Sequence, residues 1–147
     1  MRITDALLGE HGVFYAQFGA LERETPRATT LEQVRAQAAL LQAALESHAR
    51  IENDLLFAAL EPSLGGQGPL AVMRHEHDQI EGGLAAVQTA GGLAPAQELL
   101  LHVVATARSH FAKEEQILFP MARQALTEAE QARLAEAWAE RRQVVVV

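Results

Sequence analysis

Four long segments of this chain each carry an apolar stripe, in which hydrophobic residues recur at alternating steps of three and four. That spacing keeps the side chains on one face of an α-helix, so each stripe predicts a helix with one buried side. Six stripe positions are polar, although burying an unpaired carboxylate or imidazole is costly. These six residues are His11, His48, Glu52, His77, His110 and Glu114.

The apolar members of the stripes are the predicted core. Successive members are separated by about one helical turn, so they should stack along each axis and meet the stripes of neighbouring helices. No convincing run of alternating polar and apolar residues competes with this pattern, which leaves no material for a sheet. The expected core residues are Leu7, Phe14, Phe18 and Leu21; Val34, Ala38, Leu41, Leu45, Leu55 and Ala59; Met73, Ile80, Leu84 and Val87; and Val103, Ala107, Ile117 and Met121.

Clusters of glycine and proline separate the stripes and predict the turns. Short turns between long helices favour antiparallel neighbours. Two capping boxes, Thr30 with Gln33 and Thr127 with Glu130, indicate helix starts. The fold class is therefore predicted to be all-α, one domain over residues 1–147, an up-down-up-down four-helix bundle with a short fifth C-terminal helix. The expected helices span residues 4–24, 31–61, 70–89, 95–125 and 128–142.

Composition limits the chemistry open to the six polar residues. The 147 residues include no cysteine, which leaves histidine and carboxylate as the strong metal ligands. A net charge of −7 argues against nucleic acid as a partner, because phosphate binding normally needs a clustered basic surface. No stretch approaches the ~20 apolar residues of a membrane helix, and no signal peptide precedes the first stripe. We therefore expect a cytoplasmic protein with no membrane partner.

The six polar residues should meet in one layer of the bundle. With a rise of ~1.5 Å per residue, the histidines of the first and third helices lie near the starts of those helices, whereas Glu52 and Glu114 lie toward the ends of theirs. His48 and His110 each precede a glutamate by four residues, which stacks both side chains on one helix face. Two such His-x-x-x-Glu pairs can place both carboxylates between two cations, with the four imidazoles in the outer positions.

Imidazole and carboxylate donors with open positions suit iron, with manganese or zinc as alternatives. The Glu-x-x-His motif of ferritin-like proteins and the His-Glu-x-x-His motif of zinc peptidases do not occur in the sequence. A lone interior histidine is more often a hydrogen-bonded core residue than a ligand. Two matching pairs on interior stripes favour a metal site over that interpretation.

Four parts of the sequence carry a family resemblance: His11, HARIENDLLFAAL from residue 48, MRHEHDQI from residue 73 and HFAKEEQILFP from residue 110. Together they resemble the hemerythrin-like, His-His-Glu cation-binding family over nearly the whole chain. The resemblance implies two iron ions, joined by an oxo or hydroxo bridge. It also implies His11, His48, His77 and His110 as terminal metal ligands, and Glu52 and Glu114 as bridging ligands.

The third helix departs from the oxygen-carrying hemerythrins, which place a fifth histidine one turn before another on this helix. Here Met73 occupies that place, and Glu81 follows one turn after His77. The departure implies an open position, or an unusual glutamate ligand, on one iron.

Other polar residues near the stripes are expected not to be ligands. His75 points about 200° away from the neighbouring ligand on an ideal helix, so we expect it at the surface. His102 lies about 12 Å along the axis from the nearest ligand, and we expect it to be structural. For Glu76, Asp78 and Glu115 we favour solvated charges over the alternative that they accept hydrogen bonds from imidazole N–H groups.

The resemblance implies a non-haem di-iron protein that binds or senses dioxygen or nitric oxide. One alternative is an enzyme with peroxidase-like, nitric-oxide-reducing or iron-oxidising activity, in which an acid such as Glu81 assists at the open position. Another is iron storage or donation for iron-centre repair, although relatives with that activity carry a cysteine-bearing segment. Leu134 and Trp138 on the fifth helix are expected to cover the bundle flank or a partner subunit. A homo-oligomer and a separate signalling partner both stay open.

Overall fold

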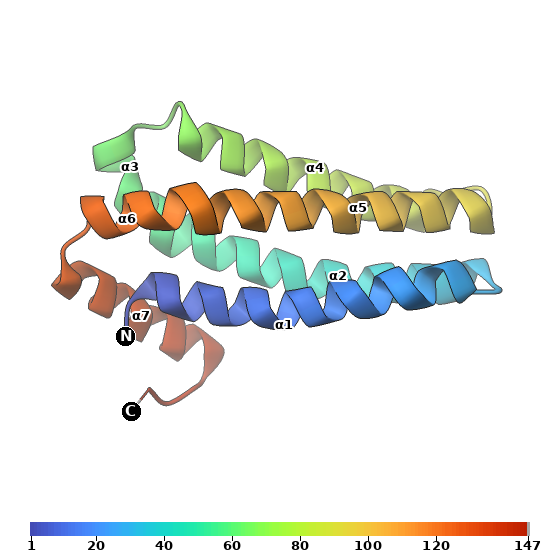
Figure 1. The fold of residues 1–147 in the computed structure, drawn as a ribbon, viewed down its shortest axis with the longest axis horizontal. Helices are drawn as coiled ribbons and strands as arrows, with labels where there is room; N and C mark the ends of the chain where they lie inside the picture. Colours follow the sequence, from blue (N-terminus) through green and yellow to red (C-terminus); the bar gives the residue numbers. More distant parts are fainter. Residues whose placement is uncertain (147) are drawn as a thin grey trace.

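The computed structural model describes residues 1–146 as helices joined by short turns (Figure 1). No strand occurs in that range, and the prediction of an all-helical bundle is confirmed. Two of the predicted long helices each consist of an α-helix, a π-helical segment and a second α-helix. The elements are α1 Ile3–Glu24, a 3₁₀ turn Thr25–Arg27, α2 Leu31–Ile51, the first π segment Glu52–Phe57, α3 Ala58–Leu64, α4 Pro69–Thr89, α5 Leu93–Lys113, the second π segment Glu114–Leu118, α6 Phe119–Ala125 and α7 Glu128–Arg142.

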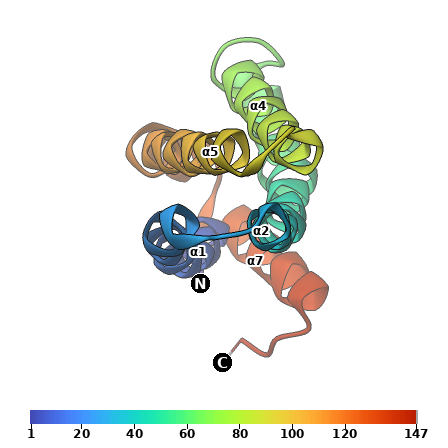
Figure 2. The ribbon, with the colours of Figure 1, turned by 90° about the vertical axis from the view of Figure 1, so that its right-hand side faces the viewer.

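Four helices form the bundle, and a fifth lies on its flank. Seen from the end, α1, α2, α4 and α5 stand at the four corners (Figure 2). Successive members run in opposite directions along the long axis (Figure 1), which is the predicted up-down-up-down order. α4 packs against α2 and α5, and α1 packs against α5. α7 lies outside this ring and packs against α1 and the first π segment.

Both predicted capping boxes are present and begin α2 and α7. The hydroxyl of Thr30 accepts a hydrogen bond from the backbone N–H of Gln33 at 3.3 Å, and that of Thr127 accepts one from Glu130 at 3.2 Å. In each box, the side chain three residues on accepts the backbone N–H of the threonine. These bonds satisfy amides that have no partner inside the helix, so they fix where each helix begins.

The first π segment shifts the buried stripe by one residue. Beyond Glu52, the predicted core residues Leu55 and Ala59 are only half-buried, and Leu56 and Leu60 are fully buried in their place. A π-helical turn holds one residue more than an α-helical turn, so every later residue is displaced by about 100° from its α-helical phase. The predicted core positions beyond Glu52 are therefore wrong by one residue.

The second π segment has the same effect. Ile117, a predicted core residue, is 56% exposed, and Met121 is half-buried. Leu118 and Ala122 are buried instead. All other predicted core residues are buried as expected.

Buried apolar side chains form two clusters, one on each side of the six polar residues. On α1, Leu7 belongs to one cluster and Phe14 to the other, and His11 lies between them in the sequence. The order is the same along α4. It is reversed along α2 and α5, which run the opposite way, and after α5 the other cluster begins in the second π segment with Leu118. The polar residues therefore form a layer between two apolar cores.

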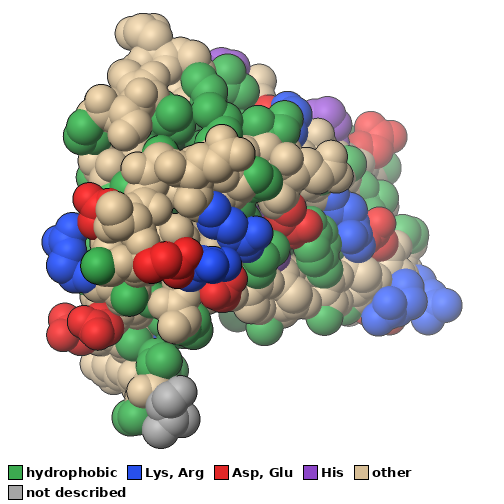
Figure 3. Space-filling view, turned by 60° about the vertical axis from the view of Figure 1, so that its left-hand side comes forward, with side chains coloured by type: hydrophobic (Ala, Val, Ile, Leu, Met, Phe, Trp, Pro, Cys, Tyr) green, Lys and Arg blue, Asp and Glu red, His purple; other side chains and the backbone are tan. Residues whose placement is uncertain are grey.

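The surface of the described residues is mixed in character. Acidic and basic side chains are interspersed among apolar ones on the face drawn in Figure 3. Within residues 1–146, no helix combines the length and the apolar composition needed to cross a membrane. Val144, Val145 and Val146 of the C-terminal tail are exposed, and Val147 lies outside the described residues.

Candidate metal centre

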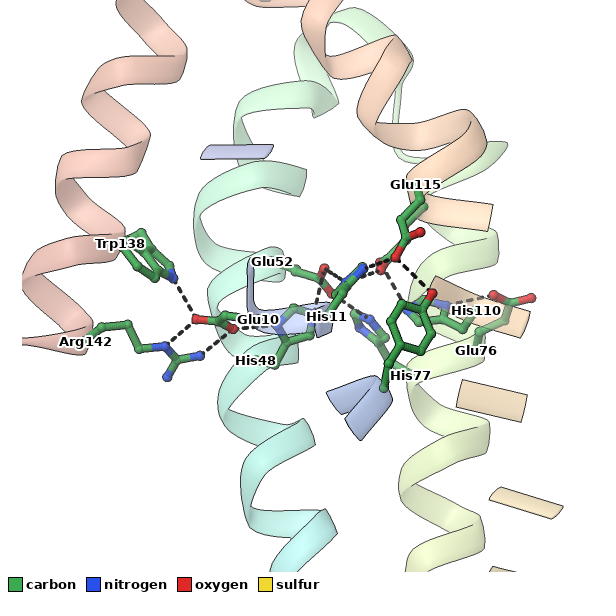
Figure 4. Close-up of polar contacts among 12 residues, drawn as sticks. Glu10, His11, His48, Glu52, Glu76, His77, His110, Glu115, Trp138 and Arg142 are labelled. Carbon is green, nitrogen blue, oxygen red and sulfur yellow. Dashed lines mark hydrogen bonds and ion pairs between the residues drawn. The ribbon is translucent and has the colours of Figure 1, made fainter. Parts of the chain in front are cut away.

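The six polar residues of the stripes meet in the interior of the bundle, where none is more than 7% exposed. Figure 4 shows most of them converging from the helices around this layer. They form two groups, and in each group the donor atoms lie within 4.8 Å of one another. Glu52 and Glu114 belong to both groups. One group adds His11 and His48, and the other adds His77 and His110.

Each shared carboxylate directs one oxygen toward each group. In the first group, Nε2 of His48 lies 3.1 Å from Oε1 of Glu52, and Nε2 of His11 lies 3.3 Å from Oε2 of Glu114. In the second group, the histidine of α4 lies 3.2 Å from the other oxygen of Glu52, and the histidine of α5 lies 3.1 Å from the other oxygen of Glu114. A carboxylate that bridges two cations needs this arrangement.

The imidazole and carboxylate atoms that face the interior of the site lack hydrogen-bond partners, although several of these atoms lie close to one another. Both oxygens of Glu52 and of Glu114, and Nε2 of three histidines, are buried without an aligned donor or acceptor among the described residues. Folded proteins rarely leave such groups unsatisfied. Metal ions placed between them would satisfy all of them at once, and imidazole nitrogen with carboxylate oxygen is a donor set that suits iron, manganese or zinc. The residues present therefore fit a pair of metal ions.

Each shared carboxylate is the first residue of a π segment. Glu52 begins Glu52–Phe57, and Glu114 begins Glu114–Leu118. π-helical turns are frequent at functional sites because they redirect side chains within a continuous helix. Here each His-x-x-x-Glu pair keeps its α-helical face toward the site, and the wide turn then carries the bulky residues after it, such as Leu56 and Phe57, into the apolar core.

A family comparison agrees with this geometry. Residues 2–95, more than half of the chain, match the model of the hemerythrin HHE cation binding domain. The chain belongs to this hemerythrin family. The matched range includes three of the four histidines, and His110 and Glu114 of the same two ligand groups follow it on α5 and the second π segment. Comparisons with curated proteins and with solved structures give no match.

Three histidines of this hemerythrin domain also contact a carboxylate through the outer ring nitrogen, Nδ1. Nδ1 of His11 lies 2.9 Å from Oε1 of Glu115, and Nδ1 of His110 lies 2.8 Å from Oε2 of Glu76. Such an acceptor fixes the ring orientation and leaves Nε2 free to bind a metal. The expectation that Glu76 and Glu115 are solvated charges is therefore wrong, because each reaches a histidine on a neighbouring helix.

Each of these two acids has a second partner. The hydroxyl of Tyr15 donates to Oε1 of Glu115 at 2.9 Å, and burial together with this bond raises the pKa of Tyr15 to about 12. Lys113 pairs with Glu76. Burial alone would raise the pKa of Glu76, but the hydrogen bonds with Lys113 and His110 lower it. Glu76 therefore stays ionised and can accept a hydrogen bond from the N–H of the His110 imidazole.

The acceptor for the third histidine is Glu10, which is not among the residues predicted from the sequence. Nδ1 of His48 lies 2.6 Å from Oε2 of Glu10. Two residues of α7, Trp138 and Arg142, donate to the other oxygen of Glu10 at 2.7 and 2.6 Å (Figure 4). Local patterns cannot show these contacts, since the partners lie 128 and 132 positions away. The place of Glu10 directly before His11 is the one indication that the sequence offers.

In the metal-free protein, the charges of the site favour the protonated form of two histidines, His48 and His110. Burial alone would lower the pKa of His48, but the charge of Glu52 and the hydrogen bond with Glu10 raise it to about 10. Burial likewise opposes the charged form of His110, but close contact with Glu114 raises its pKa to about 9. Burial raises the pKa of Glu10, yet the three donors just described lower it to about 2. A metal ion must therefore displace protons from these two histidines.

His77 differs from the other three histidines. Its Nδ1 atom is buried and has no hydrogen-bond partner within residues 1–146. A cavity of about 20 Å³ adjoins it and also reaches His48 and His110. Glu81, one turn after His77, lines the same cavity, but it is exposed and belongs to neither ligand group. Of the two residues of the departure noted on the third helix, Glu81 thus lies beside this small space, whereas Met73 does not line it.

The remaining polar residues of interest lie outside both ligand groups. His75 is exposed, as expected. His102, which we expected to be structural, is also exposed. Asp78 is exposed, which agrees with a solvated charge.

Proposed function

We propose that this hemerythrin-domain protein holds two iron ions and binds or senses a small diatomic ligand, dioxygen or nitric oxide. The observation that carries the proposal is the pair of ligand groups that share two carboxylates. Four imidazoles and two carboxylates suit iron, and metal analysis separates it from manganese and zinc. In this proposal His11 and His48 hold one ion, His77 and His110 hold the other, and Glu52 and Glu114 bridge them.

When bound, two iron ions supply electron exchange and a coordination position for an incoming ligand. The protein contributes fixed donors and exclusion of water. The ring of Phe111 stacks on His11 with centroids 3.8 Å apart, and the ring of Phe57 stacks on His77 at 5.7 Å. Apolar packing of this kind controls solvent access to a metal and the polarity around it.

The cavity supports a very small ligand. A space of about 20 Å³ holds about one water molecule, so it suits a diatomic molecule far better than an organic substrate. Its lining includes His77 and His110 of the second group and His48 of the first, so in this proposal the ligand approaches on the side of the site where the two groups meet. The rest of its wall is mainly apolar, formed by Leu45, Glu46, Ala49, Ile80, Glu81, Leu84 and Phe111.

A di-iron enzyme is the alternative that one observation favours. Glu46 and Glu81 line the cavity that reaches the histidines, and a carboxylate in this place can deliver protons during reduction of oxygen, peroxide or nitric oxide. Reversible binding needs no such proton supply. The two functions therefore differ in whether the ligand is recovered.

Anaerobic reconstitution with ferrous iron tests the proposal. We expect two iron ions per chain, and an absorption change on adding dioxygen or nitric oxide that reverses when the gas is removed. Consumption of the gas without a reversible adduct would replace ligand binding with the enzymatic function. Failure of a folded chain to take up iron, with zinc or manganese bound instead, would overturn the di-iron assignment.

A further inference from the structure

The three carboxylates that contact histidine Nδ1 atoms are held in different ways. Glu115 and Glu76 have second partners within the four-helix ring, namely Tyr15 on α1 and Lys113 on α5. Glu10 has its second partners on α7, which lies outside that ring. Among the described residues, Glu10 thus connects a candidate metal ligand, His48, to the flanking helix α7.

Both oxygens of Glu10 are held by pairs of donors. Oε1 accepts from Nε1 of Trp138 at 2.7 Å and from Nε of Arg142 at 2.6 Å. Oε2 faces Nδ1 of His48 at 2.6 Å and accepts from Nη2 of Arg142 at 2.9 Å. Nη1 of the same arginine donates to Oγ of Ser47, the residue before His48, at 2.5 Å. A guanidinium that binds both oxygens fixes the plane of the carboxylate as well as its position.

We infer that α7 is a working part of the metal centre: Trp138 and Arg142 are positioning residues that orient the ring of His48 through Glu10. Without these donors, Glu10 is free to rotate toward solvent, and its bond to the imidazole competes with water. The ring of His48 then has to be ordered when the metal binds, which costs conformational entropy. With α7 docked, that ordering is already in place.

Metal binding and docking of α7 are therefore coupled, and thermodynamic linkage makes the coupling reciprocal. If docked α7 strengthens metal binding by some factor, bound metal strengthens docking by the same factor. Occupancy of the buried site is thereby transmitted to a helix on the surface. This inference depends on the cation site and is independent of which diatomic ligand the site binds.

The chain offers a matched control on the same helix. Arg141 forms an ion pair with Asp54 of the first π segment at 2.7 Å, and both side chains are exposed. Arg141 forms no hydrogen bond or ion pair with Glu10 in the described part of the chain, so Arg141→Gln removes one charge and one ion pair from docked α7 without releasing that carboxylate. Such exposed pairs contribute little to stability. Arg142→Gln removes the same charge but releases Glu10.

The experiment measures ferrous iron affinity by anaerobic competition with a chelator, for the parent chain, Arg142→Gln, Trp138→Phe and Arg141→Gln. We expect Arg142→Gln to weaken binding by about tenfold, the lower end of the effect of losing a group that orients a metal ligand. Trp138→Phe should have a smaller effect, since it removes one donor and keeps most of the ring. Arg141→Gln should bind as the parent chain does. Arg142→Lys should restore part of the loss, because lysine keeps the charge without the bidentate geometry.

Hydrogen exchange of the α7 backbone provides a second readout that does not depend on ligand chemistry. In the parent chain, iron should slow exchange of the α7 amides by a factor similar to the affinity change, and this protection should be reduced in Arg142→Gln. Equal losses of affinity in Arg141→Gln and Arg142→Gln would overturn the inference, because α7 would then act only as a general cover. Unchanged α7 exchange on iron binding would also overturn it. A parent chain that takes up no iron would instead refute the di-iron proposal, and a repeat of the comparison with zinc would then decide the coupling.

Discussion

Oε1 of Glu115 lies 2.9 Å from Nδ1 of His11, although the two residues are 104 positions apart in the chain. Glu115 directly follows Glu114, so two adjacent acids contact the two ring nitrogens of His11: Glu114 lies beside Nε2, and Glu115 lies beside Nδ1. We predict that Glu115→Ala leaves the fold intact and weakens metal binding by about 10- to 100-fold, because the His11 ring loses the group that orients it. Competition with a chelator measures the metal affinity. Glu98→Ala, an exposed glutamate on α5, is the control, and an equal loss there would contradict the assigned role.

The shared carboxylates should matter to both ions. Because Glu52 and Glu114 each contribute to both ligand groups, Glu52→Ala or Glu114→Ala should reduce the metal content from about two ions per chain toward none. His77→Ala should mainly remove the ion of its own group. Elemental analysis with circular dichroism separates loss of metal from loss of fold. A chain that keeps one tightly bound ion without Glu52 would show that this carboxylate does not bridge.

Metal affinity should rise with pH. Nearby carboxylates raise the pKa of His48 to about 10 and that of His110 to about 9, so both carry protons at neutral pH in the metal-free protein. An ion can bind Nε2 only after a proton leaves, so each proton released makes binding about tenfold tighter per pH unit below these pKa values. Titration calorimetry in buffers of different ionisation enthalpy counts the protons. Affinity that is independent of pH between about pH 6 and pH 8 would show that the histidines are already neutral.

Filling the cavity should slow ligand access without removing metal. Ala49 lines the cavity and is 8% exposed, so Ala49→Val places two additional carbon atoms in or beside a space of about 20 Å³. We expect unchanged iron content and a several-fold slower association of nitric oxide, measured by stopped-flow absorption. Ala43→Val, on the exposed side of α2, controls for the lower helix propensity of valine. Equal association rates in both variants would mean that the ligand reaches the site by another route.

Spacing along the sequence was sufficient to predict the bundle, the caps and the six residues that meet in the interior. It failed beyond Glu52 and Glu114, where the predicted positions Leu55 and Ile117 are replaced in the core by Leu56 and Leu118. An α-helical period cannot anticipate a turn that holds an additional residue. A signal was nevertheless present, because both glutamates are followed after the same interval by Leu-Phe, two bulky residues that one α-helical stripe does not easily bury together.

The acids around the histidines were harder to predict for a different reason. Glu10, Glu76 and Glu115 each lie beside a stripe, where an α-helical pattern assigns them to solvent. Whether such an acid meets a histidine depends on the rotation of the neighbouring helix and, for Glu10, on where α7 docks. These are tertiary relationships between distant parts of the chain. The outer contacts of the site therefore needed the structure.

Each π segment holds one residue more than a regular α-helix would need to bury the same side chains. Loss of a single residue just after either glutamate would turn the wide turn into an α-helical one, and Leu56 or Leu118 would then fall on the α-helical stripe. All six donors would still be present in such a sequence, and the apolar residues beyond would still face the core. In an evolutionary comparison, a one-residue gap at this point would therefore mark a relative that has lost only the wide turn beside a shared carboxylate.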